Sequence, residues 1–238
     1  MSWLTRQSGR GRRRLLASAA TGLLLAAGGT LALGVSEQQH APRPPASAAL
    51  PSSNPAIPHP AATPAGAPGT SGAPSAVPPA PAARAVTPTA ISIPAIGVQH
   101  ALLSLGQNSD GTLQVPPLSD VSAPGWDHNS PVPGQVGPAV VVGHIDGTTG
   151  AEGVFYSLGA LRPGDTVSIT RSDGTVAVFR IDGVNVYAKD AFPTLTVYGN
   201  TTNPQLRLIT CGGRFDHATQ HYLDNTVAYA TLTGIHRG

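Results

Sequence analysis

Two residues of this chain, Cys211 and His144, are of the types that nucleophilic catalysis uses, and each follows a run of strand-forming residues. Cys211 is the single cysteine of the 238 residues and follows the strand-like run 206–210, before two glycines. His144 comes just past the buried-strand pattern of 138–142, after one glycine. A lone thiol has no internal disulfide partner, so it is either an inert core residue or a nucleophile. A histidine within its reach exchanges protons with a thiol, a substrate or a leaving amine.

Each of these residues also has a plainer interpretation. His144 alone is typical of a half-buried histidine with satisfied hydrogen bonds, and Cys211 alone of a core residue. His144 and Asp146 have the types of metal ligands, but the surrounding sequence lacks the further His or Cys that a zinc site needs. We therefore expect neither a metal nor a cofactor.

The composition limits the class of protein. The chain has 24 Pro and 28 Gly, only 11% charged residues and a formal net charge of +2. Five arginines lie between residues 6 and 14, and the rest has no basic stripe with interleaved aromatics, so nucleic-acid binding is not expected. These features favour a compact β domain over a helical bundle.

The N-terminal third predicts an anchor and a spacer. Residues 15–35 contain no charge, and as a helix they would span roughly 31 Å, close to the thickness of the membrane hydrocarbon. The basic segment 1–14 would stay in the cytoplasm, which makes 15–35 a signal-anchor with the remainder outside the cell. A cleaved signal peptide is the alternative. Residues 36–87 are rich in Pro and Ala and have no aromatic residue, which predicts a disordered linker.

Residues 88–236 have the sequence pattern of one β domain. Short runs of β-branched and apolar residues recur between turn signals, and the sequence Ser-Asp-Gly at 172–174 predicts a hairpin. Only 153–161 and parts of 190–200 suggest short helices. Seven or eight short strands predict a barrel or a sandwich. The expected strands lie at 90–98, 138–142, 166–170, 176–181, 184–187, 206–210 and 225–230.

Several of these runs together resemble the sortases, cysteine transpeptidases of Gram-positive cell envelopes. Residues 208–211 (LITC) are similar to the TLxTC signature, and 143–146 (GHID) to the element around the catalytic histidine. The stretch 154–167 and the ending 222–230 fit as well, and Cys-Gly-Gly with the tail to Asn225 is most similar to class F, common in actinobacteria. The resemblance covers roughly 88–233.

This resemblance implies a fold and a reaction. The fold would be mainly β, a closed eight-stranded sortase-type barrel with short helices. Cys211 would cleave an LPxTG-like sorting signal through a thioester, with His144 as acid and base. The partners would be sorting signals of secreted surface proteins and an amine acceptor of peptidoglycan, at the cell membrane with the catalytic domain extracellular and a single pass through 15–35.

The chain departs from the family at one position. Sortases carry an arginine about 12–14 residues after the cysteine, where this chain has Leu223, Asp224 and Asn225. Arg214 follows the cysteine by three residues, and we expect it to serve as the third catalytic residue. Asn225 and Arg207 are the alternatives.

The missing arginine leaves a second hypothesis open: a catalytically weak, sortase-fold binding or structural protein of the cell envelope. A third, an L,D-transpeptidase acting on peptidoglycan, needs a His-Gly-Cys cluster at the nucleophile. The residues before Cys211 are Leu-Ile-Thr, which disfavours it.

Overall fold

The computed structural model describes residues 41–50 and 85–238. The expected signal-anchor at 15–35 lies outside these residues, as does most of the expected linker. Among the described residues, no helix is long and apolar enough to span a membrane.

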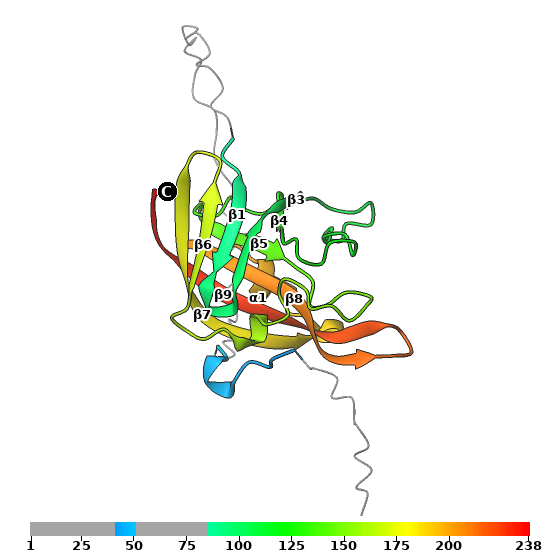
Figure 1. Ribbon diagram of the computed structural model, residues 1–238. Helices are drawn as coiled ribbons and strands as arrows, with labels where there is room; N and C mark the ends of the chain where they lie inside the picture. The colour runs from blue at the N-terminus through cyan, green and yellow to red at the C-terminus, as the bar shows by residue number, and fades with distance from the viewer. Residues whose placement is uncertain (1–40, 51–84) are drawn as a thin grey trace, which may run out of the picture. The chain divides into compact units, whose positions relative to one another are not determined.

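The described residues form a single sheet of nine strands in the order β2-β1-β6-β7-β9-β8-β5-β4-β3 (Figure 1). All neighbours are antiparallel except β5 with β8 and β3 with β4, which are parallel. The strands are β1 Pro88–Ile93, β2 Val98–Ala101, β3 Leu103–Leu105, β4 Gly125–Asp127, β5 Gly137–Val142, β6 Thr166–Arg171, β7 Thr175–Ala188, β8 Pro204–Asp216 and β9 His221–Arg237.

The two edge strands of this sheet, β2 and β3, are joined by one residue, Leu102. Because a single residue can bridge only a few ångströms, the sheet must curl until its edges approach each other. The fold is therefore a nearly closed barrel. Leu102 packs against the interior cluster at this junction.

The mainly β fold is confirmed, but the expectation of eight strands in a closed barrel is wrong in detail. The described residues contain nine strands, and no ladder joins β2 to β3. The short strands β3 and β4 have three residues each, too few for a periodic pattern. The two runs expected at 176–181 and 184–187 are one strand, β7, which continues through an irregularity between Ile181 and Gly183.

Helical structure is sparse in the described residues. The region 153–161 contains turns and one 3-10 turn, η3 Leu158–Ala160. The region 190–200 contains α1 Thr194–Tyr198, preceded by the 3-10 turn η4 Lys189–Ala191. Two further 3-10 turns are η1 Ala46–Ala48 and η2 Pro94–Ile96.

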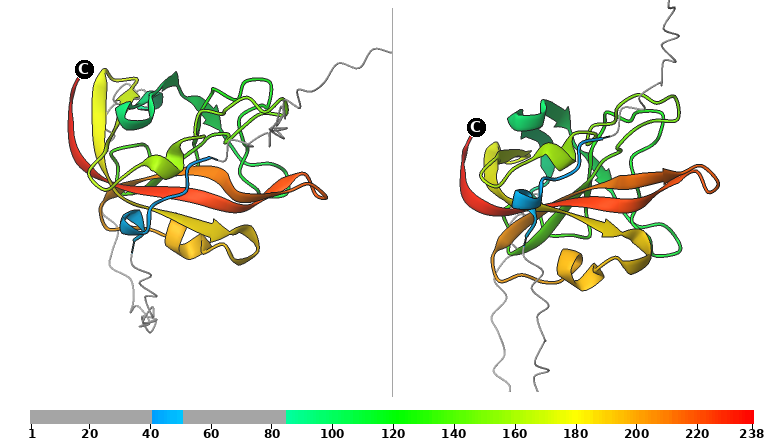
Figure 2. Two further views of the ribbon diagram at one scale, coloured as in Figure 1. Left: turned by 60° about the horizontal axis from the view of Figure 1, so that its bottom comes forward. Right: turned by 90° about the horizontal axis from the view of Figure 1, so that it is seen from below.

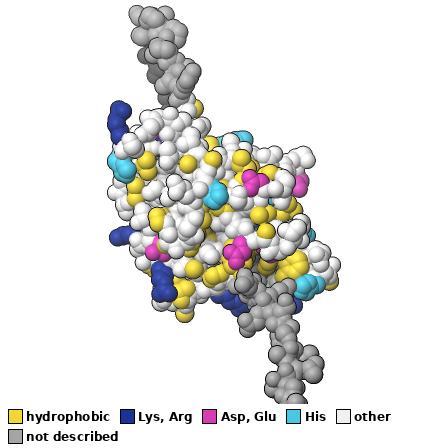
Figure 3. Space-filling view, viewed as in Figure 1, with side chains coloured by type: hydrophobic (Ala, Val, Ile, Leu, Met, Phe, Trp, Pro, Cys, Tyr) yellow, Lys and Arg dark blue, Asp and Glu magenta, His cyan; other side chains and the backbone are white. Residues whose placement is uncertain are grey.

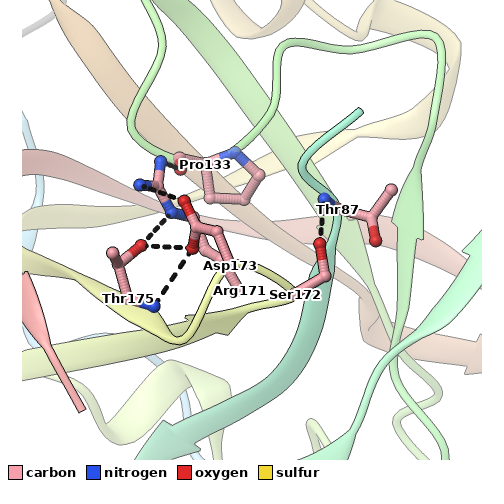
Figure 4. Close-up of polar contacts among 6 residues, drawn as sticks. All are labelled: Thr87, Pro133, Arg171, Ser172, Asp173 and Thr175. Carbon is pink, nitrogen blue, oxygen red and sulfur yellow. Dashed lines mark hydrogen bonds and ion pairs between the residues drawn. The ribbon is translucent and has the colours of Figure 1, made fainter. Parts of the chain in front are cut away.

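The hairpin expected at 172–174 joins β6 to β7 and is held by polar contacts around Arg171 (Figure 4). The Arg171 guanidinium donates to Thr175 Oγ1 at 2.7 Å and pairs with Asp173 at 3.2 Å. Asp173 in turn accepts from the backbone and hydroxyl of Thr175. Ser172 Oγ accepts from the backbone N–H of Thr87 at 3.0 Å, which ties the start of the domain to this turn.

Alternating residues of the central strands divide the core into two clusters. The larger cluster fills the barrel interior and includes Phe155, Phe179 and Leu208. The smaller cluster, called the outer cluster below, lies on the opposite face of the same strands and includes Val142, Ile209, Val227 and Tyr229. The outer cluster also contains Val197 of α1, so the connection from β7 to β8 covers this outer face. By alternation, Cys211 follows Ile209 onto it.

Residues 41–50 pack against the barrel, although the composition of this region predicts a spacer. Ala48 is 1% exposed, and the backbone N–H of Leu50 donates to Asn185 Oδ1 at 2.8 Å. A Cβ at Gly183 would lie 2.7 Å from the Ala48 carbonyl oxygen, so the glycine permits this close approach. The segment is the blue stretch in Figures 1 and 2.

Candidate active site

Cys211 lies inside strand β8, not at its end. We expected the strand to end at the cysteine, but β8 continues through the two glycines to Asp216, because β9 pairs with it along this length. The pairing is irregular between Gly212 and Phe215. Gly213 has a φ of 74° there, a left-handed conformation that glycine adopts without strain. The hairpin of β8 and β9 beyond Cys211 projects from the barrel (Figures 1 and 2).

The parallel register of β5 and β8 brings His144 level with Cys211. Val142 is the partner of Ile209 in this ladder, and the next bond runs from the Gly143 N–H to the Ile209 carbonyl at 3.1 Å. Two residues further along both strands are His144 and Cys211. The register therefore places His144, two residues past the end of β5, level with Cys211 on the neighbouring strand β8.

Two residues on the other side of the cysteine complete a row across the sheet. Asn225 of β9 is the direct partner of Cys211, and Tyr187 of β7 is the direct partner of Asn225. Directly opposed residues of an antiparallel pair point to the same face. Asn225, one of the three residues at 223–225 where the family's arginine is expected, is thus the cross-strand neighbour of the thiol.

The imidazole of His144 is held by the loop between β3 and β4. His144 Nε2 donates to the backbone carbonyl of Pro116 at 2.6 Å. Since a carbonyl oxygen can only accept, this bond places a proton on Nε2 and leaves Nδ1 to take up and release the second proton. His144 is half-buried and Pro116 is buried. The carbonyl therefore orients the ring in the way that a second group orients the base of a catalytic pair.

Lys189 provides a contact to the thiol that sequence reasoning missed. Its Nζ donates to Cys211 Sγ at 3.4 Å. Lys189 precedes the cysteine by 22 residues and belongs to none of the motifs discussed above. The only signal available in the sequence was its place after a strand-forming run that ends at Ala188.

A hydrogen bond links the loop that carries the histidine to the hairpin that carries the cysteine. The Tyr222 hydroxyl donates to Asp146 Oδ2, and the Tyr222 ring packs edge-on against Phe215 with centroids 5.1 Å apart. Burial raises the pKa of Tyr222, and the bond to Asp146 raises it further. The hydroxyl therefore remains a donor at physiological pH. No three His, Cys, Asp or Glu side chains within 41–50 and 85–238 are grouped to hold a metal ion.

The two arginines considered from the sequence have different surroundings. Arg214 is exposed on the irregular stretch of β8. Its charge is a minor contributor to the lowered pKa of Asp216, after the backbone bond from Ala218 and the hydroxyl of Thr219.

Arg207 is 3% exposed and lies over the ring of Tyr229 at 4.5 Å. It donates to the carbonyls of Val197 and Leu206 at 3.1 and 3.2 Å, and to Gln205 Oε1 at 2.6 Å. Burial lowers the pKa of Arg207. Its donors are directed at α1 and at its own strand, which is the pattern of a structural arginine.

A thiol on one strand of a β-barrel and an imidazole just past the end of the neighbouring strand have the types and placement that cysteine-dependent acyl transfer uses. The family comparison agrees with this chemistry. The chain belongs to the sortase family, because the model of the sortase domain matches residues 91–233, more than half of its length. Sortases are cysteine transpeptidases, and Cys211 is the one cysteine that this chain offers for that role.

Solved structures similar to this chain come from several sortase classes. Sortase A of Listeria monocytogenes is 16% identical with a TM-score of 0.48, over 63% of this chain and 89% of that one. Sortase D5 of Clostridium perfringens is 23% identical with a TM-score of 0.46, over 62% and 79%. A T196V mutant of sortase E from Streptomyces avermitilis is 20% identical with a TM-score of 0.44, over 63% and 91%. Among curated proteins, no match was found.

Proposed function

We propose that this protein is a class F sortase that cleaves an LPxTG-like sorting signal and transfers the surface protein to an amine of peptidoglycan. The observation that carries the proposal is the parallel register of β5 and β8, which, continued two residues past Val142 and Ile209, sets His144 level with Cys211. An inert core cysteine would need no partner of this kind. The missing arginine suggests a catalytically weak relative, but another cation, Lys189, contacts the sulfur.

The geometry supports a two-step reaction. In the first step the Cys211 thiolate attacks the carbonyl carbon of the scissile peptide bond, and a carbon–sulfur bond forms. The carbon–nitrogen bond then breaks, and the leaving amine takes a proton from His144 Nδ1. In the second step an acceptor amine attacks the thioester, gives a proton back to His144 and displaces the thiolate, so the enzyme is regenerated.

The test of this proposal is mass spectrometry of the protein with a set of LPxTG-type peptides. The expected result is an acyl-enzyme whose added mass equals the part of the peptide before the cleaved bond. Addition of an amine such as a peptidoglycan stem peptide should consume this species and form a new amide. Cys211→Ala should form no acyl-enzyme, and His144→Ala should lose most turnover. Peptide cleavage by Cys211→Ala at the normal rate refutes the proposal.

We also propose that the protein works at the outer face of the cell membrane, anchored by residues 15–35. Support comes from the uncharged length of this segment and the arginines before it. Full-length protein should partition with membranes and be digested by protease added to intact protoplasts. Recovery in the soluble fraction, or protection from the protease, contradicts this orientation.

A further inference from the structure

The ammonium group of Lys189 contacts the sulfur of Cys211, with Nζ and Sγ 3.4 Å apart. Sortases carry an arginine near this thiol, and the corresponding positions here, 223–225, contain no cation. Lys189, which follows the end of β7, thus places a positive charge at the thiol, although the positions where the family has its arginine contain none.

The fold brings Lys189 to the thiol through strand register. Tyr187 lies in the row of residues that includes Asn225 and Cys211. Lys189 follows Tyr187 by two residues, just after β7 ends at Ala188, so it continues on the same side as the cysteine.

The chain after Lys189 is fastened to the outer face of the sheet. Phe192 packs edge-on against Tyr187, with centroids 6.0 Å apart, and belongs to the periphery of the outer cluster. Val197 is fully buried in that cluster, and its carbonyl accepts from Arg207. These anchors hold the backbone of η4 beside the thiol, while the Lys189 side chain remains exposed to solvent.

The other two candidate cations have different positions. The guanidinium of Arg207 is buried and committed to three oxygen acceptors. Arg214 is exposed, and its positive charge makes a small contribution to the lowered pKa of Asp216. Of the three, Lys189 is the one with a hydrogen bond to the sulfur.

We propose that Lys189 is a catalytic residue that supplies the positive charge of the active site, a role that the family assigns to an arginine. The inference rests on the proposed acyl transfer at Cys211. Lys189 contributes its positive charge and transfers no proton. It stabilises the thiolate before attack. In the tetrahedral adduct the oxyanion is bonded to the carbon that carries the sulfur, so an ammonium group at Sγ is close to the developing charge.

Solvent exposure limits the size of the first effect. Exposed ion pairs change an equilibrium by roughly twofold to fivefold, and salt screens them. The second effect is larger, because the substrate peptide excludes water and a charge-assisted bond to an oxyanion is worth about tenfold or more in rate. The two effects therefore predict different magnitudes in two assays.

Other ionisable groups surround the contact between Lys189 and Cys211, and they are the same in the natural protein and in the Lys189 variants. His144 follows β5, and the charge of Cys211 is felt by Tyr222 of β9. Asp224 of β9 lies over Gly213, Asp190 is next to Lys189 in η4, and Arg214 follows on β8. Substituting Lys189 alone leaves all of these groups in place.

The first test is the rate of alkylation of Cys211 by iodoacetamide, a neutral reagent that the lysine charge does not attract. Lys189→Met keeps a similar length and removes the charge, whereas Lys189→Arg retains the charge. At pH 7 we expect Lys189→Met to react roughly twofold to fivefold more slowly than the natural protein. Lys189→Arg should stay close to the natural rate. About 0.5 M salt should reduce the difference, since the Debye length is then only a few ångströms.

A matched control is Arg180→Met, which removes the same charge from an exposed position of β7, the strand that precedes Lys189. Arg180 lies eight residues before the end of β7, roughly 25 Å away along the strand at about 3.3 Å per residue. Its removal should leave alkylation unchanged. A loss equal to that of Lys189→Met would show a general charge effect and overturn the proposal.

The second test is peptide turnover. We expect Lys189→Met to lower kcat/KM by about tenfold or more and Lys189→Arg to restore most of it. Arg214→Met is compared in the same assays. The proposal is overturned if Lys189→Met alkylates and turns over normally, if Lys189→Arg fails to rescue, or if Arg214→Met carries the loss instead.

The alkylation assay needs no peptide, so it separates this inference from the proposed function. If the natural protein cleaves no sorting peptide while Lys189→Met still slows alkylation, the proposed function fails and the assignment of Lys189 to the thiol stands.

Discussion

Replacing Arg207 by Met should destabilise the protein and leave the chemistry of the thiol almost unchanged. Arg207 lies on the same face of β8 as Cys211, so alternation alone allows either a structural or a catalytic role. In the structure its guanidinium donates to Val197, Leu206 and Gln205 and lies over Tyr229. Its partners are those of an arginine that fastens α1 to β8.

The expected loss in the free energy of unfolding follows from the contacts that each partner of Arg207 loses. Gln205 is half-exposed and water can replace the bond to its side chain, while Leu206 lies within the ladders of β8. The carbonyl of Val197 is in the last turn of α1, where it has no partner in the helix. An orphaned buried acceptor costs about 1–3 kcal/mol. The lost stacking on Tyr229 adds about 1 kcal/mol, so we expect a loss of about 2–4 kcal/mol in the free energy of unfolding.

The assay is urea denaturation of a protein that begins at residue 41. Unfolding is monitored by the fluorescence of Trp126, the one tryptophan of that protein. Trp126 is 5% exposed, so its emission reports loss of the core. Arg180→Met, at an exposed position, is the control and should change stability by less than about 0.5 kcal/mol. Alkylation of folded Arg207→Met should stay within about twofold of the natural rate. Unchanged stability together with slow alkylation would refute this reasoning and give Arg207 a role at the thiol.

Three further predictions concern the elements around the site. Tyr222→Phe removes the bond to Asp146 and should cost about 1 kcal/mol of stability, with a several-fold loss of kcat/KM. Because burial and Asp146 raise the pKa of Tyr222, this contribution is complete at neutral pH and is lost only as the pH rises above about 10, which urea titrations at several pH values would show. Gly213→Ala places a side chain at a φ of 74° against a β9 carboxylate and should lower the melting temperature and the turnover together; an unchanged melting temperature contradicts the assigned backbone. Removing residues 41–50, in a protein that begins at Ala85, should lower stability by about 1–2 kcal/mol and leave peptide cleavage intact, and loss of cleavage would show that this segment belongs to the site.

Local patterns predicted the class of fold and the two residues at the centre of the site. Short β-branched runs separated by turn signals indicate a mainly β domain, because each strand buries alternate residues whatever its neighbours are. The turn at 172–174 was predicted for the same reason, since its residues alone favour a tight hairpin. Cys211 and His144 were found because each follows a strand-forming run and lies in a short signature.

The tertiary structure decided which side chains surround the thiol. The ladder between β5 and β8 sets His144 level with Cys211, and the ladders through β9 set Asn225 and Tyr187 in the same row. Lys189, two residues after Tyr187 and just past the end of β7, contacts the sulfur. Pairing registers depend on contacts among strands far apart in the chain, which a reading of local composition does not contain.

The same reason explains two of the expectations that the structure revised. Two glycines after Cys211 indicate the end of a strand, but pairing with β9 extends β8 to Asp216. The composition of 36–87 predicts a chain that cannot form a core by itself, yet residues 41–50 dock because the barrel supplies the partner surface at Gly183 and Asn185. By itself the sequence determined where strands and reactive groups occur along the chain. Only the folded barrel determined which of them meet, because register and packing are properties of the whole sheet.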